Sequence, residues 1–193
     1  MKINKLFLAL LLPFYCLNAS AQAINDPATA SVEKSLFSVQ AGVLGIWASN
    51  EVRLGNTLVL RSEIGLDGFS SVGPQKDVFA LAPSINLEPR WYYNIAKRSR
   101  KGRNTENNSA NFLGLSVKYA PDWFVIANKD NLNVYNQVYI IPKWGIRRNI
   151  GKSNFNYEFD FGIGYAYIEQ YGYEKNYSDV AVDLHARIGY TFK

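Results

Sequence analysis

His185 is the only histidine of the chain and its best candidate for proton transfer. Asp183 and Arg187 each lie two residues away, so on a β-strand all three side chains point to the same face. A histidine that activates a serine, as in a lipase or a lipid A deacylase, needs that serine within hydrogen-bonding distance and a carboxylate that orients the ring. No serine lies on that face of the same segment. We therefore interpret His185 as a histidine held among charged neighbours, with general-base catalysis as the alternative.

Glu158 and Asp160 are a second pair of groups that could act together, because they also lie two residues apart. Paired carboxylates can perform acid and base steps on sugars, but they need a cleft that admits the substrate. A narrow closed ring of about eight strands is filled by its own side chains and leaves no such cleft. We therefore expect both carboxylates to pair with cations inside the fold, and we expect no catalytic residue and no enzyme activity.

The sequence offers no evident set of metal ligands. It has one histidine and one cysteine, and Cys16 lies in a segment that we expect to be removed. No carboxylate triad stands at ligand spacing. Gly162 and Gly164 alternate within a strand-like segment rather than opening a helix, so they do not form a phosphate-binding loop. We expect no metal and no cofactor.

Apolar and polar residues alternate with a period of two over most of the chain, which predicts β-strands rather than helices. Bacterial outer-membrane barrels normally have an even number of strands, but only seven segments alternate. We suspect that residues 36–54 bend at Gly42 or Gly45 and supply two short strands. The seven segments are residues 79–93, 157–167 and 180–192, where the alternation is clearest, and residues 37–47, 57–67, 111–119 and 134–147.

Charged residues in these segments fall on the face opposite the aromatic residues. In a soluble sandwich the aromatic faces would pack together and the charges would face water. In a transmembrane barrel the aromatic faces meet lipid and the charges fill the lumen as ion pairs. We favour an all-β fold, an up-and-down antiparallel transmembrane β-barrel of about eight strands, over the sandwich. Its predicted lumen network comprises Arg61, Glu63, Glu88, Arg90, Lys143, Arg147, Glu158, Asp160, Asp183, His185 and Arg187.

Segment length and aromatic placement favour the barrel. Segments of about ten residues match the 9 to 11 residues of a tilted transmembrane strand. Large aromatic residues gather towards strand ends that an up-and-down order places at one membrane interface, as an aromatic girdle requires. These residues are Trp91, Tyr92, Tyr93, Phe155, Tyr157, Tyr190 and Phe192.

The chain opens with two lysines, an apolar run over residues 6–15 and the small residues ASA at 19–21, in the order of a secretory signal peptide. Removal of Lys2 and Lys5 lowers the formal net charge from +5 to about +3, which is too little to indicate nucleic acid binding. The expected organisation is a signal peptide over residues 1–21, a flexible leader over residues 22–34 and an outer-membrane barrel domain over residues 35–193.

Two connections between the predicted strands carry residues suited to binding. A basic connection holds Lys97, Arg98, Arg100, Lys101 and Arg103. Export argues against nucleic acid as its partner, so we interpret it as a solvated loop, with peptidoglycan or lipid phosphates as alternative partners. A second connection holds Tyr171, Tyr173 and Tyr177, which either contact carbohydrate or protein or extend the aromatic girdle.

Several stretches resemble small outer-membrane β-barrel proteins of Bacteroidetes-type bacteria. They are EVRLGN at 51–56, read as a turn, LRSEIGL at 60–66, LEPRWYYN at 87–94, PKWGIRR at 142–148 and RIGYTF at 187–192. Lys193 departs from the pattern, because such chains usually end in an aromatic residue. The resemblance implies a barrel in contact with outer-membrane lipid and transfers no catalytic residues.

We therefore predict a protein of the bacterial outer membrane, reached after signal-peptide cleavage. Its polar lumen is filled, and its role is structural or one of surface interaction. The alternatives are a barrel enzyme acting on lipid A or phospholipid, and a narrow solute channel.

Overall fold

The computed structural model describes residues 30–71, 78–129, 132, 134–169 and 177–192. Within them the chain is built almost wholly from antiparallel strands, with two short helical segments. The strands are β1 (Ser35–Gly42), β2 (Gly45–Arg53), β3 (Leu58–Ser71), β4 (Val78–Trp91), β5 (Asn111–Ala120), β6 (Ile126–Ala127), β7 (Gln137–Asn149), β8 (Phe155–Ile168) and β9 (Tyr177–Phe192). The helical segments are α2 (Ile95–Arg100) and the 3-10 turn η2 (Glu106–Asn108).

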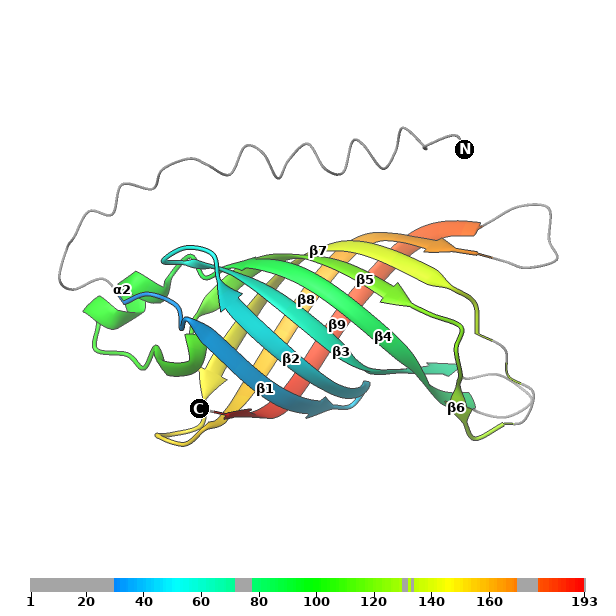
Figure 1. Ribbon diagram of the computed structural model, residues 1–193, viewed down its shortest axis with the longest axis horizontal. Coiled ribbons are helices and arrows are strands. Elements are labelled where there is room, and N and C mark those ends of the chain that lie inside the picture. The colour runs from blue at the N-terminus through cyan, green and yellow to red at the C-terminus, as the bar shows by residue number, and fades with distance from the viewer. Residues whose placement is uncertain (1–29, 72–77, 130–131, 133, 170–176, 193) are drawn as a thin grey trace.

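All nine strands belong to one sheet, in the order β3-β2-β1-β9-β8-β7-β5-β4-β6. An additional pairing of β3 with β4 closes eight of them into a ring, and the two-residue β6 pairs with β4 beyond the residues that pair with β5 (Figure 1). Each strand of the ring pairs antiparallel with its neighbours. The prediction of an all-β, antiparallel, eight-stranded closed arrangement is therefore confirmed.

The strand that the sequence left unassigned arises at the expected bend. β1 ends at Gly42 and β2 begins at Gly45, and the two strands pair across this turn. Gly45 has φ +139°, and a Cβ there would lie 2.0 Å from the carbonyl oxygen of Leu66, so only glycine fits. The turn predicted at 51–56 begins later, however, because Glu51 and Arg53 pair with β3 and belong to β2.

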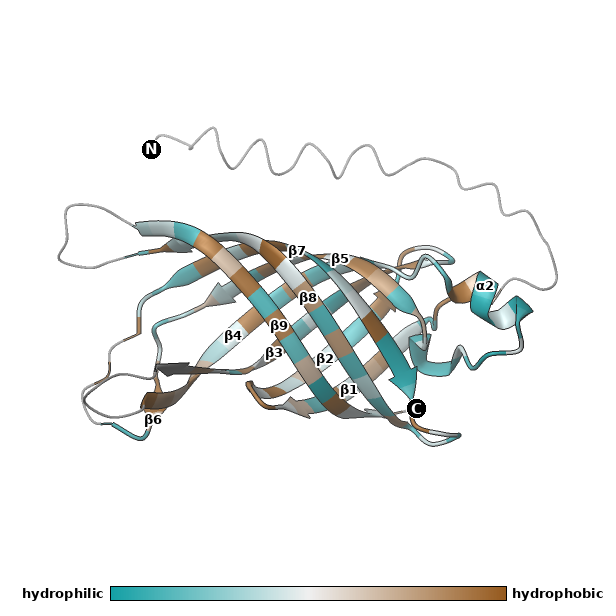
Figure 2. Ribbon diagram, turned by 180° about the vertical axis from the view of Figure 1, so that it is seen from behind, coloured by the Kyte–Doolittle hydropathy of each residue, from teal (hydrophilic) through white to brown (hydrophobic). Residues whose placement is uncertain are grey.

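The two faces of the ring have opposite character. Along β9, Val182 and Leu184 are 67% and 65% exposed on the outside, whereas the alternating charged residues are buried inside. Figure 2 shows the resulting bands of hydrophobic and hydrophilic residues along β8 and β9. Because the single sheet closes on itself, its apolar faces do not pack together as they would in a soluble sandwich.

One end of the ring, which we call the α2 end, is covered by the chain between β4 and β5 (Figure 1). An apolar cluster holds this segment in place, and its members are Val32, Val59, Tyr92, Ile95, Ala110 and Phe112. Asn107 and Asn108 of this segment are buried, with φ of 52° and 58°. This is a left-handed conformation that asparagine tolerates better than most residues. We call the opposite end, where β6 lies, the β6 end.

At the α2 end, six of the seven predicted girdle residues are not members of the apolar cluster. Phe155 pairs with Tyr190, and Phe192 pairs with Phe37 of β1, so the aromatic residues of neighbouring strands stand at one level. Tyr92 is an error of the prediction: it follows β4 and turns inward, where it is fully buried against Phe112.

Some predictions fall outside the described residues. These are the signal peptide at 1–21, residues 22–29 of the leader, and Tyr171 and Tyr173 of the tyrosine-rich connection. Tyr177 is described at the start of β9, where it is exposed and its hydroxyl donates to Asp179. Among the described residues, no helix has the length and hydrophobicity needed to cross a bilayer.

Candidate functional site

The interior of the ring is a dense network of charged side chains. The structure places all eleven residues of the predicted network there, and none of them is more than 6% exposed. Each comes from an inward position of a strand, because the alternation along β3, β4, β7, β8 and β9 directs it away from the apolar face.

Two carboxylates and three guanidinium groups form the centre of this network. Glu51 Oε1 lies 3.1 Å from Arg147 Nη1, 3.3 Å from Arg61 Nη1 and 3.6 Å from Arg90 Nη1. Glu158 faces the same three arginines, at 3.0 Å from Arg90 and 3.6 Å from both Arg61 and Arg147. Since isolated charges are strongly disfavoured away from water, the two carboxylates and the three arginines stabilise one another.

Glu51 is the principal residue that the sequence analysis missed. Besides the three arginines, it accepts hydrogen bonds from the Tyr92 hydroxyl at 3.1 Å and from Asn108 Nδ2 at 2.7 Å. It therefore joins the centre of the network to the segment that covers the α2 end. The signal that could have found it is the spacing of two that runs from Trp47 to Ser49 to Glu51 and forms the inward face of β2.

Two chains of ion pairs lead from the centre towards the β6 end. In one, Arg61 pairs with Glu63, and Glu63 Oε2 lies 2.7 Å from Arg187 Nη1. In the other, Glu88 accepts from Arg90 at 2.8 Å and lies 4.0 Å from Lys143. Lys143 Nζ then lies 2.7 Å from Asp183 Oδ2 and 3.3 Å from Asp160 Oδ1. Asp160 thus faces Lys143, and Glu158 faces Arg61, Arg90 and Arg147, so both carboxylates have cationic partners inside the ring.

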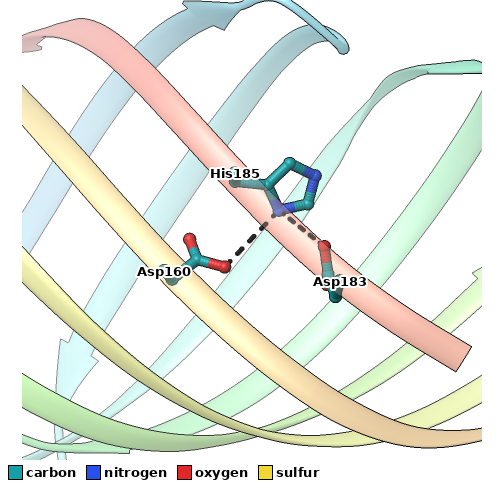
Figure 3. Close-up of side chains that lie close together, drawn as sticks. All are labelled: Asp160, Asp183 and His185. Carbon is teal, nitrogen blue, oxygen red and sulfur yellow. Dashed lines mark ion pairs between the residues drawn. The ribbon is translucent and has the colours of Figure 1, made fainter.

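His185 stands among these groups at the inner face of β9. Its Nδ1 lies 2.9 Å from Asp183 Oδ1 and 3.5 Å from Asp160 Oδ1 (Figure 3). Arg187 Nη2 lies 3.0 Å from the same nitrogen, and the ring packs edge-on against Trp47 with a centroid distance of 5.3 Å. The imidazole is thereby fixed by charged neighbours on one side and by an aromatic ring on the other.

Asp160, Asp183 and His185 also have the composition of a metal site. One ligand atom from each lies within 4.8 Å of the others, a grouping that is not evident in the sequence. The sequence could not show it, because β8 and β9 bring Asp160 beside His185 across the sheet. The Lys143 ammonium already contacts both carboxylates, so their negative charge has a cationic partner without a metal.

A cavity of about 430 Å³ opens at the β6 end, and its lining includes Asp183, His185, Asp67 and Lys118. The expectation that the ring leaves no cleft therefore does not hold at this end. Asp67 accepts from Trp47 Nε1 at 2.6 Å and from Lys118 Nζ at 2.7 Å. Within the described residues, no serine hydroxyl is hydrogen-bonded to His185.

The basic connection lies at the opposite end of the ring. Lys97, Arg98, Lys101 and Arg103 line a pocket of about 370 Å³, whereas Arg100 lies outside it. Arg148, at the end of β7, is the fifth basic residue that lines this pocket. Sequence spacing did not associate it with a loop about fifty residues earlier, because only strand pairing brings the two together.

Comparison with known proteins adds no functional assignment, because no protein-family model, no curated protein and no solved structure matches this chain.

Proposed function

We propose that this protein is an outer-membrane β-barrel with a filled polar lumen, and that its role is structural or one of surface interaction. In this proposal it resides in the bacterial outer membrane after its signal peptide is cleaved, and its main partner is outer-membrane lipid. The observation that carries the proposal is the inverted arrangement of the ring, with charges buried inside and apolar side chains exposed outside.

Exposed apolar area on this scale favours a hydrocarbon solvent. Burial of apolar surface away from water is worth about 25 cal/mol per Å², and soluble monomers rarely expose large continuous apolar patches. Here Phe159, Phe161 and Ile163 form an uninterrupted outward row on β8, next to Val182 and Leu184 on β9. In lipid these side chains need no further partner, and the backbone is satisfied by the closed sheet.

The long strands and their aromatic ends support the same placement. β3, β4 and β8 have 14 residues each, more than the 9 to 11 that a tilted membrane-spanning strand needs. At the α2 end, Trp144 Nε1 donates to the Tyr93 hydroxyl at 2.9 Å, and Trp91 packs against the Tyr93 ring. Exposed aromatic residues with polar groups are typical of the membrane–water interface.

The filled interior supports a closed barrel rather than a channel. Arg61, Arg90 and Arg147 are among the largest fully buried side chains of the molecule, and they meet at the centre of the ring. In planar bilayers the purified protein should give no stepwise conductance. Stable conductance steps would instead favour the alternative of a narrow solute channel.

A barrel enzyme acting on lipid A or phospholipid is the second candidate. It is favoured by one observation, that His185 Nδ1 lies 2.9 Å from Asp183 Oδ1 at the wall of the cavity at the β6 end. The lack of a serine partner for His185 among the described residues makes it the weaker of the two.

Membrane fractionation tests the main proposal. After expression, inner membrane, outer membrane and soluble periplasm are separated, and the protein is followed on gels with and without heating. We expect it in the outer-membrane fraction, with a mobility that changes on heating because the closed sheet resists detergent. Recovery in the soluble periplasm would contradict the proposal.

A further inference from the structure

Five of the eight residues that line the pocket at the α2 end are positively charged. It lies between α2, the residues that follow α2, and the ends of β5 and β7. No Asp or Glu of the described residues is among its lining, whose neutral members are Tyr93, Asn94 and Asn111. The five basic residues that line it are Lys97, Arg98, Lys101, Arg103 and Arg148.

These cations differ from those inside the ring. Each interior arginine has a carboxylate within 4.0 Å, whereas none of the five pocket residues forms an ion pair within the described part of the chain. Like charges that lie together without counter-charges repel one another. An anion bound among them would be attracted to each, and this attraction would offset the repulsion. The described residues therefore supply cationic side chains at this pocket, and an anionic ligand would supply the counter-charge.

The fold holds two of the guanidinium groups in place. Arg148 donates to the carbonyl oxygen of Arg147 at 2.7 Å and to the side chain of Asn111. Asn111 is itself fixed, because its backbone N–H donates to Asn94 Oδ1 at 2.8 Å. A site whose donors are already positioned loses less entropy when a ligand binds.

Arg98 is also held by a hydrogen bond to the backbone and has one unpartnered donor among the described residues. Its Nη2 donates to the carbonyl oxygen of Asn104 at 3.0 Å. Its Nε is buried and has no hydrogen-bond partner among the described residues. Burial, and after it the nearby charge of Arg103, lower the pKa of Arg98.

We propose that this pocket binds a phosphate group, either free in solution or carried on a lipid headgroup. Guanidinium forks match the oxygen geometry of phosphate and carboxylate equally well. Five positive charges around one pocket favour a doubly charged phosphomonoester over a singly charged carboxylate. The pocket does not depend on membrane placement of the ring, so failure of phosphate binding would leave the proposed function standing.

Calorimetric titration of the full-length protein tests this proposal. The protein is purified in a maltoside detergent and titrated in phosphate-free buffer of low ionic strength, because salt screens such interactions. The probes are inorganic phosphate, acetate, and phosphatidic acid presented in mixed micelles. We expect phosphate to bind more tightly than acetate. Phosphatidic acid binding at least about tenfold tighter than inorganic phosphate identifies the lipid headgroup as the source, and equal binding identifies free phosphate.

The variants R98Q and R148Q each remove one charge from the pocket, and we expect each to weaken phosphate binding about tenfold or more, as for loss of a charge-assisted hydrogen bond. R103Q tests the same pocket at an exposed side chain, where folding is not at risk. R100Q is the matched control, since it removes the same charge from the same helix outside the pocket. The proposal is overturned if no phosphate probe binds, if acetate binds equally well, or if R100Q weakens binding as much as the others.

Discussion

Asn108 Nδ2 donates a hydrogen bond of 2.7 Å to Glu51 Oε2, and this bond joins the segment that covers the α2 end to the ion pairs inside the ring. The Tyr92 hydroxyl reaches the same carboxylate from the end of β4. The covering segment and the interior network are therefore one structure, and a change at Glu51 should be felt in both.

The variant E51Q should lower the free energy of unfolding by about 3 kcal/mol, the lower range for removing one partner of a buried ion pair. Arg147 then keeps only Glu158 as an acidic partner among the described residues, whereas Arg61 also keeps Glu63 and Arg90 also keeps Glu88. Because Asn108 and Tyr92 lose a charged acceptor, trypsin should also cleave the basic segment after β4 faster. Urea unfolding in detergent micelles and timed proteolysis measure the two effects. E106Q, at an exposed carboxylate of η2, is the control and should change neither; equal behaviour of the two variants would refute the role given to Glu51.

Lys143 and Lys118 form ion pairs of the same length, 2.7 Å, to Asp183 and Asp67 respectively, but the Lys143 pair is far more deeply buried. K143M leaves Asp160 and Asp183 without their ammonium partner. We expect it to destabilise the protein by about 3 kcal/mol, and we expect K118M to cost about 1 kcal/mol or less, since water reaches that pair. Urea unfolding midpoints compare them. A larger effect of K118M would mean that the interior network does not carry the stability assigned to it.

The variant H185A separates a structural from a catalytic histidine. Asp183 keeps its Lys143 partner when the imidazole is removed, so we expect heat-modifiable mobility to persist with a loss of about 1 kcal/mol in stability. Mass spectrometry of lipid A and phospholipids from cells expressing wild type or H185A should give the same profile. A modification present only with the wild type would favour the enzyme.

Two leucine substitutions test what surrounds the outside of the ring. Leu184 lies near the middle of β9 on the outer face, whereas Leu54 lies in the turn after β2 and is exposed to a similar extent. An arginine at the centre of a bilayer costs about 2 to 4 kcal/mol and much less near the interface. L184R should therefore reduce the amount of folded protein in the outer membrane strongly, and L54R should not. If both variants accumulate like the wild type, the outer face does not meet hydrocarbon.

The alternating pattern predicted the ring because strand side chains alternate strictly between two faces. It identified the inward charges of β8 and β9, and Gly42 and Gly45 marked the bend between β1 and β2. It did not extend to strand ends. Glu51 was assigned to a turn although β2 continues past it, and Tyr92 was assigned to the outer face although the chain turns inward there.

Contacts between strands far apart in sequence were beyond reach of the pattern. Arg148 enters the basic pocket, and Asp160 meets His185, only because of the register in which the strands pair. Trp47 was not singled out, yet its ring packs on His185 and on the Arg187 guanidinium. Such contacts depend on how the closed ring brings distant strands together. The alternating pattern of a single sequence does not give the register of that pairing.

Spin labelling of β9 in reconstituted vesicles tests most directly whether the outer face contacts lipid. The only cysteine, Cys16, belongs to the expected signal peptide, so V182C and L184C would each carry one nitroxide, with K152C in the turn after β7 as the aqueous reference. We predict that labels at 182 and 184 collide more with oxygen, which concentrates in hydrocarbon, than with a water-soluble nickel complex, and that the label at 152 does the reverse. Labels at 182 and 184 that collide mainly with the nickel complex would contradict the account.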